Sequence, residues 1–325
     1  MAATKPVHFS ELLKDAPKNW GRFGPNDEIG ALNFLTSAEV LRGIRSVKQG
    51  KVFTLGVPVA RPGGDPLYPS RSQPIRTNAM DKGFYIAGKA QPFPGGMEYA
   101  DDVITMYLQG TTQYDALGHV WHGDTIYNGY DAKTTIGSLA KCSIQPIAEH
   151  GVVGRGVLID AARFKGKDSL DAGERITLDD MLAAAKKQNS PIEKHDIIII
   201  HTGWLKRFYD KGVEGIFPKG VFNEPGLGYS IELAKWFHEM EIPSVGSDTI
   251  ATEQTNHEES GTMTPLHMAL LHYQGGDLQR NRLDARPRGG LREGWPVHVP
   301  VRGRSVKGGR RSRFTGQPDR NKVGP

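Results

Sequence analysis

The sequence Gln109-Gly-Thr-Thr-Gln113-Tyr-Asp115-Ala-Leu-Gly-His119 places amide, carboxyl and imidazole side chains at alternating positions of one short stretch. The residues just before it, 104–108, alternate apolar and polar side chains, which is typical of a half-buried strand. Because successive side chains of a strand point to opposite faces, the polar groups at odd positions would share one face of an extended backbone. The pattern predicts a strand with its apolar face on the core and its polar face available for chemistry.

This stretch resembles the signature HxGTHxDxPxH of the cyclase family of metal-dependent hydrolases, which includes bacterial kynurenine formamidase and isatin hydrolase. Asp115 falls on the signature aspartate and His119 on its last histidine, whereas Gln109 and Gln113 occupy the first two histidine positions. The resemblance implies a divalent metal held by Asp115 and the two glutamine positions, with His119 as general acid and base. It also implies that His267 contributes to the metal centre from a distant part of the chain. The ligand types that the sequence offers, imidazole, carboxylate and amide, favour Mn²⁺ or Zn²⁺.

Strand-like and helix-like segments alternate along the rest of the chain, which predicts an α/β fold. The expected strands cover residues 52–59, 152–160, 196–201 and 244–248, and the expected helices cover residues 37–47, 177–187 and 230–240, with a further helix beginning at Thr264-Pro265. Residues 60–102, rich in glycine and proline, are expected to form a long irregular loop. The family resemblance implies a mixed-sheet domain of the swivelling β/β/α type.

The 325-residue chain is expected to form one domain over residues 20–275, after an N-terminal arm over residues 1–19. Residues 276–325 contain 13 Lys and Arg against 4 Asp and Glu and therefore carry a net charge of +9. Because the whole chain carries +5, residues 1–275 carry −4. The basic character therefore belongs to the tail. Its composition predicts disorder. Alternatively it is a frame-shifted C-terminus, because losing one G from the codons after Gly275 would give apolar sequence similar to that of family members.

Six further residues are candidates for binding a substrate. Three of them, Trp121, His122 and Tyr127, follow the signature in a segment expected to be a hairpin or loop with aromatic walls. Trp204 follows an expected strand and Asp248 ends one, at the strand ends where α/β folds bind ligands, and Phe23 lies in the N-terminal part of the chain. Each also has a structural alternative, since aromatic side chains fill cores and loop aspartates serve turns.

The expected reaction, implied by the resemblance, is hydrolysis of a C–N bond in a cyclic amide or an N-acyl arylamine, as in isatin or formylkynurenine. The resemblance also implies a homodimer or homotetramer. The single cysteine, Cys142, excludes an internal disulfide and a cysteine cluster for zinc. No apolar run approaches the roughly 20 residues needed to cross a bilayer, and the N-terminus lacks the apolar core of a signal peptide, so a cytoplasmic protein is expected.

Two other classes of function stay open. The first is a small-molecule binding protein without catalytic activity on the same scaffold, because glutamine replaces two of the signature histidines. The second is a polyanion binder that uses the Arg-rich tail. That tail lacks the interleaved aromatic residues of base-stacking surfaces, so nucleic acid is not the expected partner.

Overall fold

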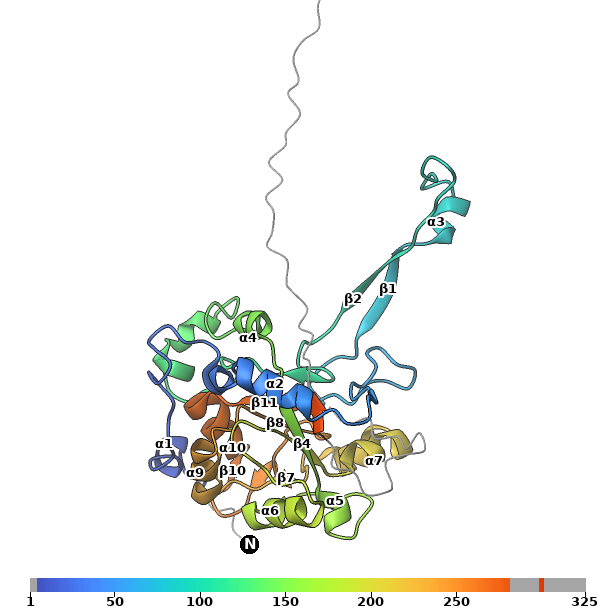
Figure 1. Ribbon diagram of the computed structural model, residues 1–325. Helices are drawn as coiled ribbons and strands as arrows, with labels where there is room; N and C mark the ends of the chain where they lie inside the picture. The colour runs from blue at the N-terminus through green and yellow to red at the C-terminus, as the bar shows by residue number, and fades with distance from the viewer. Residues whose placement is uncertain (1–4, 281–297, 301–325) are drawn as a thin grey trace, which may run out of the picture.

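The computed structural model describes residues 5–280 and 298–300 of the chain. Its centre is a six-stranded mixed sheet with the order β12-β4-β6-β8-β11-β3 (Figure 1). The four inner strands run parallel to one another, and the two edge strands are antiparallel to their neighbours. The strands are β3 (Gln113–Tyr114), β4 (Arg155–Asp160), β6 (Ile197–His201), β8 (Ser244–Ser247), β11 (Asp277–Arg280) and β12 (His298–Pro300). The expected α/β fold with a mixed sheet is confirmed.

Helices and short strand pairs surround this sheet. The α-helices are α1 (Phe9–Leu12), α2 (Ser37–Arg45), α3 (Lys82–Ile86), α4 (Ile144–His150), α5 (Ala161–Phe164), α6 (Leu178–Lys187), α7 (Trp204–Lys211), α8 (Val213–Ile216), α9 (Ile231–Glu239) and α10 (Pro265–His267). α10 continues as the π-helix η5 (Met268–Gln274), and short 3₁₀ helices are η1 (Gly30–Phe34), η2 (Tyr127–Gly129), η3 (Ala132–Thr135) and η4 (Pro218–Gly220). Small two-stranded sheets pair β5 (Arg175–Ile176) with β7 (Gly226–Leu227), and β9 (Asn256–His257) with β10 (Thr262–Met263).

Local sequence signals explain where two of these helices begin. Thr177 and Asp180 form a capping box at the start of α6: each side chain accepts a hydrogen bond from the other residue's backbone N–H at 3.1 Å. α2 begins at Ser37, the first residue of the expected range, and its cap is Thr36. The Thr36 side chain accepts a hydrogen bond from Ala38 N, and Glu39 accepts one from Thr36 N.

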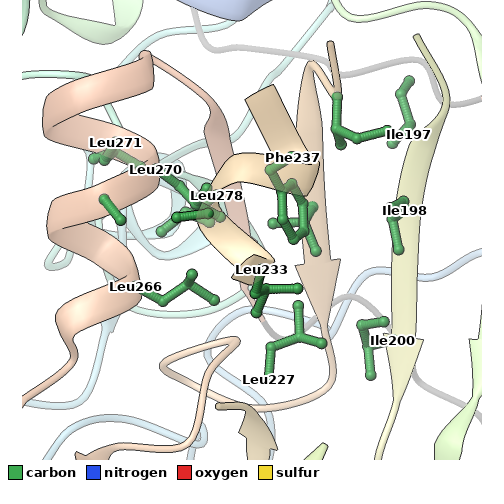
Figure 2. Packing of buried hydrophobic residues seen from close by; sticks show 14 of the residues in the cluster. Ile197, Ile198, Ile200, Leu227, Leu233, Phe237, Leu266, Leu270, Leu271 and Leu278 are labelled. Carbon is green, nitrogen blue, oxygen red and sulfur yellow. The ribbon is translucent and has the colours of Figure 1, made fainter. Parts of the chain in front are cut away.

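The core lies between the sheet and the helices that follow β7 and β10. Figure 2 shows Leu233 and Phe237 of α9 between Leu266, Leu270 and Leu271 on one side and the isoleucines of β6 on the other. The run 197–200 is at most 1% exposed, which agrees with the continuous apolar pattern of a buried parallel strand. Truncating one such side chain to alanine costs about 2–5 kcal/mol.

The segment before the signature stretch does not pack on the core. Among the strands that the structure describes, β2 (Asp101–Thr105) pairs only with β1 (Ile75–Met80). These two strands form an arm that projects from the body, with α3 near its tip (Figure 1). Ile104 is 45% exposed and Leu108 71% exposed, so the expectation that this strand has a core face is wrong. Period-2 alternation indicates a strand, but it does not say whether anything covers that strand.

Two neighbouring expectations also differ from the structure. Residues 52–59, expected to be a strand, have no regular structure, and Val52 is 92% exposed. Residues 60–102, expected to be irregular throughout, include β1, α3 and the start of β2. A segment forms a strand only where another strand pairs with it, and the sequence pattern of a segment does not identify that partner. Residues 52–59 have no such partner in the described part of the chain, whereas β1 has β2.

The N-terminal segment lies along the body rather than apart from it. Asn19 N donates to Tyr273 O at 2.9 Å, and Trp20 Nε1 donates to His272 O at 2.8 Å. At the other end, β11 carries the sheet beyond the domain boundary expected at residue 275. Also within the expected tail, β12 pairs with β4. The remaining residues of that tail, 281–297 and 301–325, lie outside the described residues, and so do the frame-shift hypothesis and the polyanion site that concern them. No helix in the described part of the chain is long and apolar enough to cross a membrane.

Candidate functional site

The signature stretch enters the sheet at its edge and then turns. Asp115 N donates to Leu278 O of β11 at 3.0 Å, and the Asp115 side chain is fully buried. Gln113 lies two residues earlier and donates through Nε2 to Asp115 Oδ1 at 2.9 Å. After Asp115 the backbone forms a turn, in which His119 N donates to Ala116 O at 2.9 Å. Alternation along a strand therefore brings Gln113 and Asp115 together, whereas His119 reaches the same place through the turn.

Two histidines face the buried carboxylate from different parts of the sequence. His119 Nε2 lies 3.9 Å from Asp115 Oδ1, and His267 Nε2 lies 4.0 Å from Asp115 Oδ2. The His119 side chain is 22% exposed and that of His267 only 4%. Of the two imidazoles, His119 is therefore the one that can meet a small molecule, whereas His267 is enclosed by the protein.

The orientation of His267 is fixed by Glu253, a residue that the sequence analysis did not select. The Glu253 carboxylate accepts hydrogen bonds from Leu266 N at 2.7 Å, from His267 N at 2.8 Å, and from His267 Nδ1. Because Nδ1 is bonded to Glu253, the opposite ring nitrogen of His267 is directed at Asp115. No local signal identifies Glu253, since it lies 14 residues before His267 in a buried loop.

The arrangement differs from the metal centre that the family resemblance implies. In the part of the chain that the structure describes, no three His, Cys, Asp or Glu side chains are placed to hold a metal ion. Gln113 directs its NH₂ group, not its oxygen, at Asp115. The backbone oxygen of Gln109 accepts from Arg71 Nη1 at 2.5 Å, a contact that does not involve the Gln109 side chain. As arranged, these residues do not fit the expected centre of Gln109, Gln113, Asp115 and His267.

Three of the candidate substrate-binding residues have structural roles. Trp204 is 1% exposed and belongs to an apolar cluster with Leu205 and Phe208. Asp248, 2% exposed, accepts from both Thr202 N and Thr202 Oγ1 at 2.7 Å, which holds the turn into α7. Tyr127 is fully buried and donates to Asp27 Oδ2 at 2.7 Å, and burial raises the pKa of its hydroxyl.

The other three candidates lie nearer the surface. His122 Nε2 is 3.2 Å from Tyr273 OH, and burial, followed by the charges of His8 and Lys18, lowers the pKa of His122. Trp121 is 40% exposed. Phe23 packs edge-on against Phe34, with 5.1 Å between the ring centres. Contact of any of these six residues with a substrate stays a prediction.

A second histidine–carboxylate pair lies at the carboxyl ends of β4 and β6. His201 Nδ1 is 2.9 Å from Asp160 Oδ1. Burial alone would lower the pKa of His201, but the hydrogen bond with Asp160 and the charge of Asp248 raise it above its usual value. The same pairing lowers the pKa of Asp160 against the opposite effect of burial.

Known proteins resemble this chain in sequence and in structure. The Cyclase family model matches residues 53–254, more than half of the chain. The chain belongs to the cyclase family. A crystal structure described as that of a novel cyclase is 34% identical to it, with a TM-score of 0.72, and the match covers 82% of this cyclase-family chain and 86% of the other. The expected family is thereby confirmed.

More distant structural matches share less of the sequence. Isatin hydrolase A from Ralstonia solanacearum is 16% identical, with 78% of this chain and 90% of the other covered and a TM-score of 0.49. Isatin hydrolase A from Labrenzia aggregata, bound to benzyl benzoate, is 14% identical, with 78% and 89% covered and a TM-score of 0.45. No protein with curated annotation matches the chain. The matched family region includes Asp115, His119 and Glu253 and ends before His267.

Proposed function

We propose that this cyclase-family chain is a hydrolase that cleaves a C–N bond in a cyclic amide or an N-acyl arylamine. One observation carries the proposal: the buried carboxylate of Asp115 is faced by two imidazoles, and one of them, His119, is accessible from outside. A partly exposed imidazole beside a buried carboxylate is suited to move a proton between water and a substrate. Membership of the cyclase family supports the same reaction class.

In the proposed reaction, His119 takes a proton from a water molecule as the water oxygen attacks the carbonyl carbon. A C–O bond forms, and the positive charge on His119 is stabilised by the Asp115 carboxylate, 3.9 Å away in a site with little solvent. The C–N bond then breaks, and His119 returns the proton to the departing nitrogen. The products are a carboxylic acid and an amine, which remain in one molecule when the substrate is cyclic.

His267 acts on this reaction through Asp115. Its Nδ1 is bonded to Glu253, so its Nε2 stays directed at the second oxygen of the Asp115 carboxylate. This contact keeps the carboxylate facing both imidazoles. His267 is therefore a positioning residue, and we expect its replacement to reduce kcat more than it changes KM.

The expected Mn²⁺ or Zn²⁺ has no part in these steps, because the described residues do not fit the implied metal centre. The metal is tested separately, by dialysing the protein against a chelator and then adding back either ion. A rate that falls on chelation and returns with one ion supports the implied metal.

The proposal is tested with purified protein, an N-formyl arylamine and isatin, with hydrolysis followed by absorbance. We expect turnover by the unchanged chain and at least a hundredfold loss of kcat/KM in Asp115→Asn. The matched control is His150→Ala, because His150 is exposed at the end of α4, where its ring contacts Gly151 O. Binding of these compounds without any hydrolysis would instead favour the alternative of a non-catalytic binding protein.

A further inference from the structure

The side chain of Gln113 lies against the buried carboxylate of the candidate site. Its Nε2 is 2.9 Å from Asp115 Oδ1, and Asp115 is 0% exposed. An ionised carboxylate accepts hydrogen bonds and donates none, so the Gln113 atom that faces it is the NH₂ group. The amide oxygen, the one atom of this side chain that can bind a hard cation, therefore lies on the other side of the amide carbon. Gln113 thus donates a hydrogen bond at the position where the resemblance implies a metal-binding histidine.

The sheet holds Gln113 in this place. Gln113 is the first residue of β3, which pairs with β11, and Asp115 N donates to Leu278 O of β11 at 3.0 Å. Because side chains two positions apart on a strand lie on the same face, this pairing puts Gln113 beside Asp115. The residue before β3 is also fixed, since Thr112 Oγ1 accepts from Val57 N at 2.8 Å. The amide contact therefore depends on regular backbone structure and not on a free loop.

The two oxygens of the Asp115 carboxylate have different neighbours. Oδ1 accepts from Gln113, and it is also the oxygen that His119 Nε2 faces at 3.9 Å. Oδ2 faces His267 Nε2 at 4.0 Å. The hydrogen bond from Gln113 therefore fixes the rotation of the carboxyl group and keeps one oxygen toward each imidazole.

A buried carboxylate must be stabilised by its surroundings, because its removal from water is costly unless hydrogen bonds or opposite charges compensate. In a metal centre of the implied kind, the divalent ion would supply this compensation. In this chain the Gln113 amide donates to Oδ1, and the imidazoles of His119 and His267 face the two oxygens. The NH₂ group is a donor only, whereas the imidazole expected at this position would offer a lone pair to an ion.

We propose that Gln113 takes the place of the metal ion in this chain: its amide holds the Asp115 carboxylate, and the site carries out its chemistry without a divalent ion. Gln113 is a positioning residue, because it acts on His119 through Asp115. The part of the proposal that concerns the rate rests on the proposed hydrolase function, whereas the part that concerns the ion does not. The identity of residue 113 therefore decides whether the site binds an ion.

Ion binding is tested with the full-length chain, freed of metals by a chelator, by titration calorimetry with MnCl₂ and, separately, with ZnCl₂. We expect no binding to the wild-type chain that depends on Asp115. Gln113→His places an imidazole beside Asp115 and near His267, and should bind one ion per chain at least tenfold more tightly than the wild type. Gln145→His is the matched control and should show no such gain, because Gln145 also donates to a carboxylate at 2.9 Å, that of Glu149, but both residues are exposed on α4.

Two results of this titration would overturn the proposal. One is an ion site in the wild-type chain that Asp115→Asn abolishes. The other is a Gln113→His chain that is folded by circular dichroism and binds either ion no better than the wild type, because residue 113 would then not decide whether the site binds an ion.

Kinetics give a second measurement of the same contact. With an N-formyl arylamine as substrate, Gln113→Leu should lower kcat at least tenfold with little change in KM, since it removes a hydrogen bond to the charged group that faces His119. In the Asp115→Asn background the same substitution should have no further effect, because Gln113 acts through that carboxylate. Gln145→Leu is the control and should leave both constants unchanged.

The kinetic outcomes separate this proposal from the hydrolase function. A full tenfold loss in the Asp115→Asn background, or a wild-type rate that falls on chelation and returns with an added ion, would overturn the role of Gln113 and leave the hydrolase function in place. Absence of hydrolysis with and without ions would refute the hydrolase function, and the ion titration would then decide the role of Gln113 by itself.

Discussion

Replacement of Glu253 tests how the candidate site is held together. Its carboxylate, 1% exposed, accepts three hydrogen bonds, from Leu266 N, His267 N and His267 Nδ1. Thr264, the residue before α10, has no side-chain cap bond, so Glu253 takes over the capping of this helix. In Glu253→Ala three buried donors lose their acceptor, at about 1–3 kcal/mol each. Allowing for partial relaxation, we expect a loss of about 4 kcal/mol in the free energy of unfolding.

The assay is urea denaturation at pH 7, followed by circular dichroism. A loss of about 4 kcal/mol should also lower Tm by roughly 6 °C in a chain of this size. Glu258→Ala is the matched control, because Glu258 is an exposed glutamate five residues further along the same loop region. A loss below about 1 kcal/mol in Glu253→Ala would refute the reasoning, since it would mean that the carboxylate does not hold His267 and the start of α10.

Two further predictions concern packing around η5. Burial, followed by the charges of His122 and Lys18, lowers the pKa of His272 to about 4. A histidine in the unfolded chain titrates near pH 6.5, so the unfolded state binds more protons than the folded state between pH 6.5 and 4, and the free energy of unfolding should fall by about 3 kcal/mol as pH drops through this window. His272→Phe should remove this pH dependence, measured by urea titrations at several pH values. An unchanged dependence of stability on pH in this variant would contradict the prediction. Gly30 has φ +58°, and a Cβ there would overlap Gly275 O. Gly30→Ala should therefore lower the free energy of unfolding by more than about 2 kcal/mol in the same assay. Unchanged stability would show that the two segments do not approach so closely.

Features that depend on local chemistry could be predicted from the sequence. Thr177 and Asp180 mark the start of α6 because both partners of the capping box lie within four residues. The apolar run of β6 identifies a buried strand without knowledge of its neighbours. The alternating pattern of residues 104–108 wrongly predicted a strand face on the core. The pattern indicates a strand but not its partner, and here the partner is another exposed strand.

The site itself was only partly predictable, for a similar reason. The resemblance pointed to Asp115, His119 and His267, and the structure brings these three together. Glu253 could not be found, because its role depends on a loop that approaches α10 only in the folded chain. Trp204, buried in an apolar cluster, shows that an aromatic residue near a strand end looks the same in sequence whether it lines a pocket or fills the core.

The central claim, that His119 transfers protons beside Asp115 during C–N bond hydrolysis, is tested most directly by chemical rescue. The kcat/KM of His119→Gly is measured with an N-formyl arylamine, with and without added imidazole, beside His150→Gly as the control. The account predicts a loss of about 10²–10⁴-fold in His119→Gly that imidazole partly restores, and no change in the control. Hydrolysis by His119→Gly at the wild-type rate would contradict it.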